Sequence, residues 1–485
     1  MGRVGTPLIA AFVAGVPGFG HGSDSGLRPA GQVQEAAPRP ARTLRVGPAA
    51  EFRSIGEAIA ASSSGDTLRV AAATYRERLV IRHRLTLLGE EWPVLDGGGA
   101  GHVVESFAPL TLRGFVIRGS GTAVDREDAG VMVRAGPVRI ERNRLEDVFF
   151  GIYLKDAAGS VIRENQVRGK PLPLPRRGDG IRLWHSSRSR ILGNVVEGTR
   201  DVVVYFSDSL LVADNLIRSG RYALHYMYSH HNRFLRNRFL GNQVGSFIMY
   251  SREIELRGNV FARAAGATGM GLGLKDADGI RVEGNLFVDN GIGIYLDNSP
   301  TSRESRNLFR ENLLLGNGTG VHLLPSVRDN SFVANALEGN GTPVAVAGGT
   351  APGTAEQNRW SGNHWSEYAG FDADGDGLGD TPFVHARLSD DLLGRHPELR
   401  LFTYSPALRV VDLLSRFFPL LRPEPVVVDS APLRESGLPA RWAGEDPRVG
   451  GRRPPGTRAG AALLWGGLAL FVSGLLAGGR WRWVR

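Results

Sequence analysis

Asparagine recurs through the middle of the chain at intervals close to 22 residues, and this repeat constrains the fold more than any other feature. It stands at positions 143, 165, 194, 215, 237, 259, 285, 312 and 335, each time with an apolar residue one or two positions later. One coil of this length cannot bury its own apolar face, so the coils must stack. The repeat predicts an all-β, right-handed parallel β-helix of the pectate-lyase type. Asparagine tolerates left-handed backbone, and its amide can bond the equivalent amide one coil away.

An apolar–x–apolar strand lies about thirteen residues before each asparagine. Alternation places these apolar pairs inward and the residues between and after them outward. The inward pairs are Ile152/Leu154, Ile181/Leu183, Val202/Val204, Leu224/Tyr226, Ser246/Ile248 and Leu272/Leu274. The outward residues form two columns, which read Tyr153, Arg182, Val203, His225, Phe247, Gly273 and Lys155, Trp184, Tyr205, Met227, Met249, Lys275.

Two thioethers and an imidazole are the outward residues that suggest chemistry. Equivalent positions in successive coils belong to neighbouring parallel strands about 4.8 Å apart, so we expect Met227 and Met249 to be direct neighbours facing solvent, with His225 on the same face. Such soft donors favour Cu(I) over harder ions. Met270 and His230 are weaker candidate ligands. An aromatic and methionine-rich surface for protein contact explains the same residues and stays open as an alternative.

The outward columns lack the paired carboxylates that a glycoside hydrolase needs. Asp201, Asp208 and Asp214 stand where turns are expected. We therefore expect no enzyme, with a carbohydrate-active β-helix enzyme or a metal-free docking scaffold as alternatives. The absence of cysteine excludes thiolate metal sites and thiol catalysis. The net charge of +9 comes from scattered arginines without a basic block, so nucleic-acid binding is not indicated.

A second candidate metal site is the acidic run that holds Asp372, Asp374, Asp376 and Asp380. Alternating acids at this spacing resemble the first half of a calcium loop, although Phe383 stands where the twelfth-position glutamate belongs. A rigid Asp/Gly turn is the alternative. After this run, Ser405 and Pro406 predict the start of a helix whose apolar face could close the last coil or dock a partner.

Composition divides the chain into segments along its length. Residues 1–22 are predicted as a signal peptide, 23–42 as a linker, 43–365 as the β-helix and 366–435 as a capping region. A helix over Phe52–Ala61 is expected to cover the first coil, followed by a strand over Thr67–Ala71 and, among later strand–turn units, one over Leu110–Ile117. Residues 436–458 form a second linker. Residues 459–479 carry no charge and are long enough to span a bilayer, which predicts a membrane anchor with the cytoplasmic tail 480–485.

Several ordered runs between residues 43 and 435 resemble the NosD family, the periplasmic β-helical proteins required to mature nitrous oxide reductase. The runs that carry the resemblance are Gly178–Trp184, Leu224–Ser229, Met249–Ser251, Gly271–Asp276, Gly293–Pro300, Trp365–Gly379 and Leu401–Pro406. The resemblance implies a copper-handling periplasmic protein that works with an ABC-type transporter (permease plus ATPase) and a copper-chaperone lipoprotein to supply nitrous oxide reductase. It also supports a transient Cu(I) site at His225, Met227 and Met249. The apolar segment 459–479 departs from the family pattern and implies attachment to the inner membrane.

Overall fold

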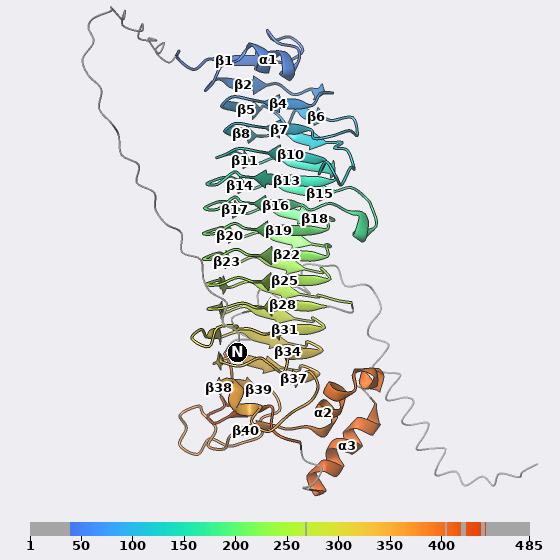
Figure 1. The fold of residues 1–485 in the computed structure, drawn as a ribbon, viewed down its shortest axis with the longest axis vertical. Coiled ribbons are helices and arrows are strands. Elements are labelled where there is room, and N and C mark those ends of the chain that lie inside the picture. Colours follow the sequence, from blue (N-terminus) through green and yellow to red (C-terminus); the bar gives the residue numbers. More distant parts are fainter. Residues whose placement is uncertain (1–38, 267–268, 403–404, 419–422, 438–441, 443–485) are drawn as a thin grey trace, which may run out of the picture. The chain divides into compact units, whose positions relative to one another are not determined.

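A computed structural model of the chain describes residues 39–266, 269–402, 405–418, 423–437 and 442. Within residues 41–442 the described chain winds into a right-handed parallel β-helix of about 13 turns (Figure 1). Each complete turn contributes one strand to each of three sheets, so strand numbers within a sheet advance by three. The predicted fold class is therefore confirmed.

The three sheets are named A, B and C and consist of the following strands. Sheet A contains β1 (Thr43–Val46), β2 (Thr67–Val70), β5 (Leu85–Gly89), β8 (Leu110–Arg113), β11 (Arg139–Glu141), β14 (Val161–Arg163), β17 (Arg190–Leu192), β20 (Leu211–Ala213), β23 (Arg233–Leu235), β26 (Glu255–Arg257), β29 (Arg281–Glu283), β32 (Asn307–Arg310), β35 (Asn330–Val333), β38 (Arg359–Ser361), β41 (Val427–Asp429) and β40 (Phe383–His385). Sheet B contains β3 (Thr74–Tyr75), β6 (Val94–Asp96), β9 (Val116–Arg118), β12 (Arg144–Val148), β15 (Gln166–Gly169), β18 (Val195–Glu197), β21 (Leu216–Arg218), β24 (Arg238–Leu240), β27 (Val260–Ala262), β30 (Leu286–Val288), β33 (Leu313–Leu315), β36 (Ala336–Glu338) and β39 (His364–Trp365). Sheet C contains β4 (Leu79–Ile81), β7 (Val104–Ser106), β10 (Ala129–Val133), β13 (Phe150–Lys155), β16 (Ile181–Trp184), β19 (Asp201–Tyr205), β22 (Tyr222–Met227), β25 (Val244–Met249), β28 (Met270–Lys275), β31 (Ile292–Asp297), β34 (Thr319–Leu323) and β37 (Thr342–Val346).

Helix α1 (Ile55–Ala61) lies against the first coil and hides the end of the core. The helix starts three residues later than the pattern predicts, because Ser54 is its N-cap and accepts a hydrogen bond from the Glu57 backbone N–H. Residues 110–117 hold the predicted strand and turn. The chain bends at Gly114, which has a φ of +84°, and so forms two strands in different sheets.

The core is a continuous column of inward-facing aliphatic and aromatic side chains. The predicted inward pairs are buried, and all of them except Ser246 belong to this apolar column. Aromatic rings stack from coil to coil inside it. Phe261 and Phe287, for example, lie 4.8 Å apart between centroids at an interplanar angle of 4°. Each coil therefore buries its apolar face against its neighbours, as stacking requires.

The repeated asparagines form a buried ladder. In each coil the backbone N–H and the side-chain N–H₂ of one asparagine donate to the Oδ1 of the next, as Asn215 does to Asn237 at 3.1 and 2.9 Å. The amide also donates to a backbone carbonyl, for example from Asn237 to Val212 at 2.9 Å. The predicted amide ladder is confirmed, but its backbone conformation differs from the prediction. The positive φ belongs to the preceding residue, such as Arg236 at +53°.

The ladder ends on a carboxylate. Asp429 is fully buried and accepts hydrogen bonds from the Asn363 backbone and side chain and from the Trp365 indole. A second ladder, which the sequence repeat did not reveal, runs from Asn290 through Asn317 to Asn340 at another corner. Buried side-chain amides thus satisfy the backbone where strands give way to turns.

The capping region follows the last coils. It contains α2 (Leu388–Arg395), η3 (Pro397–Phe402) and α3 (Pro406–Phe417), while η1 (Leu174–Arg176) lies between β15 and β16 and η2 (Ala355–Gln357) between β37 and β38. Ser405 is the N-cap of α3 and Pro406 is its first residue, as predicted. Strand β40 pairs antiparallel with β41, which adds to the end of sheet A.

None of the helices within the described residues has the length and apolarity needed to span a bilayer. The predicted signal peptide at 1–22, most of the linkers 23–42 and 436–458, the anchor at 459–479 and the tail at 480–485 lie outside the described residues.

Replacing one rung of the asparagine ladder should destabilise the solenoid strongly. Asn237→Ala leaves the Asn215 amides and the Val212 carbonyl buried without this partner. We expect a loss of about 2–4 kcal/mol in the free energy of unfolding, read from denaturant titration. Arg233→Ala, which breaks an exposed 2.8 Å pair with Glu255, is the matched control and should change stability by less than about 1 kcal/mol. Equal losses in the two variants would contradict this role of the ladder.

Candidate metal site on sheet C

The strand register of sheet C places the two methionines side by side. Met227 on β22 pairs with Met249 on β25, and His225 pairs with Phe247. The alternate residues Tyr226 and Ile248 are fully buried in the core, so the two thioethers lie on the outer face. The predicted register and facing of these residues are therefore correct.

The exposure of the methionine pair differs from the prediction. Met249 is only 8% exposed, and Met227 is half-buried. The imidazole of His225 is 20% exposed. The expectation of two solvent-exposed thioethers is thus wrong for Met249.

His225 is held by groups on both its own strand and the preceding one. The ring of Tyr222 stacks on the imidazole with centroids 4.8 Å apart. The Tyr205 hydroxyl oxygen lies 3.1 Å from Nε2 and 3.3 Å from Nδ1. Oδ2 of Asp201 lies 3.4 Å from Nδ1. The imidazole is therefore turned toward β19, whereas Met249 lies on β25, on the other side of β22.

Asp201 is not the turn residue that the sequence suggested. It begins β19, is 1% exposed, and accepts from both Nε and Nη2 of Arg221 and from the Tyr222 backbone N–H. Burial disfavours its ionised form, but the hydrogen bonds from His225 and Arg221 outweigh that effect and lower the pKa of the carboxyl. The sequence does contain one signal that Asp201 is unusual. At the equivalent position, most other coils have a small or apolar residue.

Asp179 is a second buried carboxylate, one coil before Asp201. Two nitrogens of Arg200 donate to its Oδ1 at 3.2 and 3.0 Å, and Arg182 lies 3.5 Å from its Oδ2. Burial raises the pKa of Asp179 to about 6, against the opposing effect of Arg200. This carboxylate contacts none of the candidate copper ligands.

The structure separates Met270 from the methionine pair. Met270 pairs with Val244 at the start of β28, and the column of Phe247 and Gly273 lies between it and Met249. A Cβ on Gly273 would lie 2.2 Å from the Phe247 ring and 2.8 Å from the Met270 sulfur, so these two groups fill the space above that glycine.

His230 and its neighbour lie in the turn after β22. Nδ1 of His230 accepts from the Arg252 backbone N–H at 3.2 Å, and Nδ1 of His231 lies 2.9 Å from Glu253. These contacts link successive turns between sheets C and A. The candidate ligands His230 and Met270 thus stay predictions, without support from their positions.

Four aromatic rings at the corner after sheet C form a stacked column. His185, Phe206, Tyr228 and Tyr250 have φ between +48° and +51° and succeed one another with centroids 5.0–5.4 Å apart. Left-handed backbone is strained for bulky residues, so a surface row of this kind is unusual. It runs beside the methionine pair.

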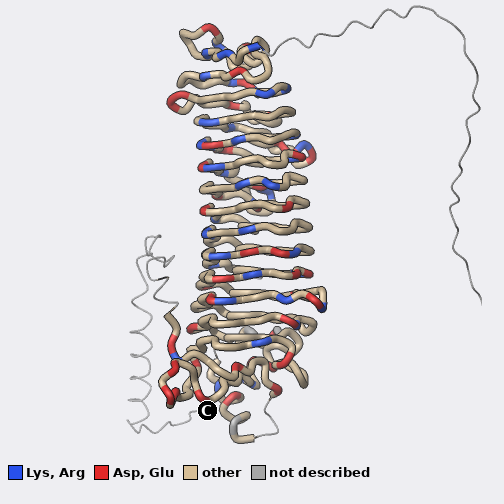
Figure 2. The backbone as a smooth tube through the Cα atoms, turned by 90° about the vertical axis from the view of Figure 1, so that its left-hand side faces the viewer, with Lys and Arg blue, Asp and Glu red and all other residues tan. Residues whose placement is uncertain are grey.

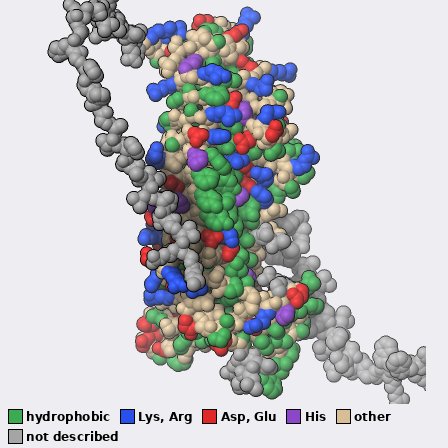
Figure 3. All heavy atoms as spheres, in the orientation of Figure 1, with side chains coloured by type: hydrophobic (Ala, Val, Ile, Leu, Met, Phe, Trp, Pro, Cys, Tyr) green, Lys and Arg blue, Asp and Glu red, His purple; other side chains and the backbone are tan. Residues whose placement is uncertain are grey.

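A hydrophobic strip runs over the middle of sheet C (Figure 3). Nearer the first coils, Leu172 in the loop between β15 and β16 packs against Phe149, Phe150 and Tyr153. Acidic and basic residues are interspersed along the coils without a block of one sign (Figure 2). The methionine pair thus lies in an apolar surface.

The acidic loop brings three of its four aspartates together. Asp372, Asp374 and Asp376 have carboxylate oxygens within 4.8 Å of one another, whereas Asp380 accepts from the Ala373 backbone N–H at 2.6 Å. Asp372 also accepts from the backbone N–H groups of Gly375 and Gly377, as a rigid turn would. The calcium site stays a prediction.

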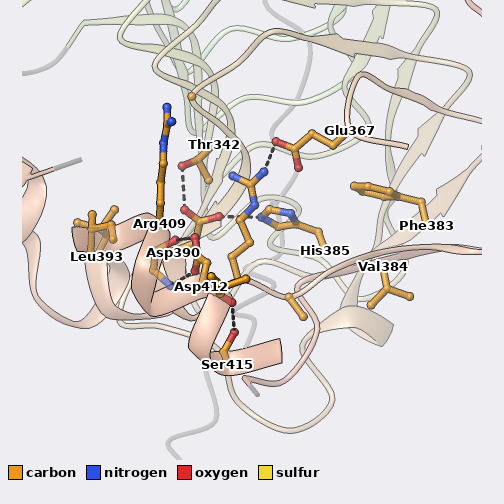
Figure 4. Close-up of a pocket in the computed structure, with 16 residues that line it drawn as sticks. Thr342, Glu367, Phe383, Val384, His385, Asp390, Leu393, Arg409, Asp412 and Ser415 are labelled. Atoms are coloured by element: carbon orange, nitrogen blue, oxygen red, sulfur yellow. Dashed lines mark hydrogen bonds and ion pairs between the residues drawn. The ribbon is translucent and has the colours of Figure 1, made fainter. Parts of the chain in front are cut away.

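A cavity of about 910 Å³ lies between the last coil of sheet C and helices α2 and α3 (Figure 4). Its walls include His385, whose Nε2 lies 3.0 Å from Asp390 Oδ2, and Thr342, whose hydroxyl donates to Asp390 Oδ1 at 3.0 Å. The side chains of His385 and Asp390 are nearly inaccessible. The cavity could not be predicted from the sequence, because the residues that line it are far apart along the chain.

The fold and the surface donors define a right-handed parallel β-helix with a soft-donor pair on one sheet. Residues 165–370 match the family model described as "Periplasmic copper-binding protein (NosD)". A protein of Pseudomonas aeruginosa named "Probable ABC transporter binding protein NosD" is 29% identical over 418 residues, covering 75% of this chain and 87% of that protein. A Stutzerimonas stutzeri protein of the same name is 27% identical over 420 residues, covering 82% and 90%. The resemblance to the NosD family is therefore confirmed over the middle of the chain.

Two solved structures also resemble the chain. The A-module of Azotobacter vinelandii mannuronan C-5 epimerase AlgE6 is 14% identical, with a TM-score of 0.48, over 64% of this chain and 92% of that one. The catalytic domain of a GH87 α-1,3-glucanase is 13% identical, with a TM-score of 0.47, over 68% and 70%. At this level of identity and overlap the likeness says nothing about activity.

The raised pKa of Asp179 predicts a pH-dependent stability. The folded chain binds this proton more tightly than the unfolded chain, so the ionised carboxyl destabilises the fold in full above about pH 6, and this loss disappears as the pH falls from about 6 through the ordinary pKa of 3.8. Asp179→Asn mimics the protonated form. From about pH 7.5 to about pH 5 the wild type should gain about 1.4 kcal/mol relative to this variant, measured by denaturant titration.

The exposed Asp214, varied as Asp214→Asn, is the matched control, and its stability difference from the wild type should stay nearly constant over the same range. A constant difference for Asp179→Asn as well would contradict the assignment of a raised pKa.

Proposed function

We propose that the chain is a periplasmic accessory protein that receives Cu(I) and passes it toward nitrous oxide reductase together with an ABC-type transporter. The donor set supports this proposal most directly, because Met227 and Met249 lie on adjacent strands of one outer face with His225 on the same face. Thioether and imidazole suit Cu(I). The family description and the relatives' names, which mention copper and an ABC transporter, point the same way.

The role is transfer rather than catalysis. The two buried carboxylates near the site are bound to arginines, Asp201 to Arg221 and Asp179 to Arg200, and so are not placed as a free acid and base. Two thioethers and one imidazole offer at most three ligands. A partner's ligand can then approach from outside the sheet and take the ion by ligand exchange.

Removing both thioethers tests the site. The double variant Met227→Ala, Met249→Ala should bind Cu(I) at least about tenfold more weakly, because only the imidazole of the proposed set remains. The measurement is a titration of the purified full chain against a competing Cu(I) chelator. Met270→Ala removes a thioether from the same sheet one column away and is the matched control. Unchanged affinity in the double variant would remove this copper site from the proposal.

The partner surface for the transporter is proposed on α3 and on η3, which precedes it. Leu401 in η3 is 91% exposed, and Phe417 and Leu413 in α3 are 69% and 51% exposed, although the sequence allowed the apolar face of α3 to close the last coil. Exposed apolar groups of this size are typical of protein contact sites. The copper-chaperone lipoprotein and the reductase stay expected partners without an assigned surface.

Charged residues on α3 should prevent assembly with the transporter. The variant Leu413→Asp, Phe417→Asp is expected to co-purify with the membrane-embedded transporter at least about tenfold less than the wild type, because burying a carboxylate in an apolar contact is costly. Val124→Asp, at a 67% exposed position in the first half of the solenoid, is the control. Full recovery of the complex with the α3 variant would exclude this face as the contact. Cu(I) affinity of the isolated chain should not change in either variant.

A further inference from the structure

The outer face of sheet B changes character along the solenoid. Two outward positions in each coil form columns, in which each residue pairs with the equivalent residue of the next coil. The first column reads Arg144, Gln166, Val195, Leu216, Arg238, Val260, Leu286, Leu313, Ala336 and His364. The second reads Arg168, Glu197, Arg218, Leu240, Ala262, Val288, Leu315 and Glu338. The early coils are thus polar or mixed on this face, whereas β27, β30 and β33 present only apolar side chains.

The apolar part of this face is buried although it points away from the core. The residues between the two columns, such as Phe261 and Phe287, belong to the interior of the solenoid. Outside it, Val260, Leu286 and Leu313 are nevertheless only 1–2% exposed.

Neighbouring strands do not account for this burial by themselves. Val195 and Leu216 stand earlier in the same column and are half-buried. Over β12 to β21 the same face forms an open groove of about 380 Å³. The late half of the face is therefore covered from outside the sheet.

Trp442 is the described part of this cover. It forms one cluster with the apolar side chains of β27, β30, β33 and β36 and is 9% exposed. A single indole is too small to cover four strands that together extend over about 14 Å. Its buried indole N–H has no acceptor among the described residues, so the rest of the cover has a donor to satisfy.

The chain itself leads the next residues onto this face. Strand β41 pairs with β38 near the end of sheet A, whereas Trp442, a short distance further on, contacts sheet B several coils back. The Gly-, Pro- and Arg-rich residues 443–458 follow and then the uncharged residues 459–479. Residues 443–458 extend over at most about 55 Å, so they can bring the uncharged run onto a face about 14 Å long.

We propose that residues 459–479 of this chain cover the outer face of sheet B over β27, β30 and β33, with Trp442 as the first contact. Both surfaces are apolar, and burying them against each other removes both from water. The same run is the membrane anchor that the sequence predicts, and it cannot lie on the sheet and cross a bilayer at once. This inference does not depend on the proposed copper site.

Disulfide trapping in the full chain tests the contact, because the chain has no cysteine of its own. Leu286→Cys is combined in turn with Leu468→Cys, Ala469→Cys and Leu470→Cys, so that the run is sampled on each side. After mild oxidation of the membrane-containing cell fraction, at least one pair should form an intramolecular disulfide, identified by mass spectrometry of the joined peptides. Leu216→Cys, in the same column but outside the cluster, is the matched control and should not be trapped.

The accessibility of a single thiol at position 286 reports the cover directly. In the full chain, a maleimide should label Leu286→Cys at least about tenfold more slowly than Leu216→Cys, because the buried thiol reacts only when the cover opens. Adding Leu468→Asp and Leu470→Asp should remove most of this protection, since a carboxylate is costly to bury on an apolar face. Labelling of Leu216→Cys should not change. If Leu286→Cys fails to fold, Leu313→Cys in the same column replaces it.

Fast labelling of Leu286→Cys in the full chain would overturn the proposal, and with a membrane-bound chain it would return residues 459–479 to the role of anchor. Slow labelling that the two charges leave unchanged would also overturn it, because another segment would then be the cover. An intermolecular disulfide, or protection that grows with protein concentration, would assign the face to a second copy of the chain instead. Protection that the charges relieve supports the proposal, and the trapped pair then locates the contact along the run.

Discussion

The hydrogen bond between one buried asparagine amide and the next is the interaction on which the rest of the structure depends. Each Oδ1 accepts two N–H groups from the preceding coil, as Asn259 does from Asn237, so a coil cannot slide by a residue without leaving buried donors unpaired. A slip of one residue would turn every outward side chain inward. The pairing of Met227 with Met249 in the register of sheet C is therefore fixed by amides buried on another side of the coil.

The repeat made the fold and the facing of the site predictable. Asparagine spacing set the coil length, and two-residue alternation set which side chains leave the core. Both signals are local, and both predict the outward facing of Met227, Met249 and His225 correctly. Both predictions are confirmed because every coil buries its apolar face with the same strand pattern. Once the inward and outward residues of one coil are assigned correctly, those of the neighbouring coils follow.

The environment of the site could not be predicted, because it depends on an irregularity in the alternation. The register between β19 and β22 shifts between Asp201 and Val203, and Ala223 turns into the core although simple alternation places it outside. This shift places Tyr222 instead of Ala223 opposite Asp201, and the Tyr222 ring stacks on His225. Similarly, the helix start at Ser405 was readable from capping residues, but the exposure of its apolar face depends on what α2 and the last coil leave uncovered.

The rigidity of the sheet explains how the proposed site could be both specific and weak. The separation of adjacent parallel strands is set by backbone hydrogen bonds, so Met227 and Met249 cannot approach one another by backbone movement. Only side-chain torsions remain to shape the coordination. The imidazole of His225, in contrast, is turned toward β19, where it contacts Asp201, and away from Met249. The fixed thioether pair would therefore supply the selectivity for a soft ion, and His225 would have to leave its contact on β19 to add a third ligand.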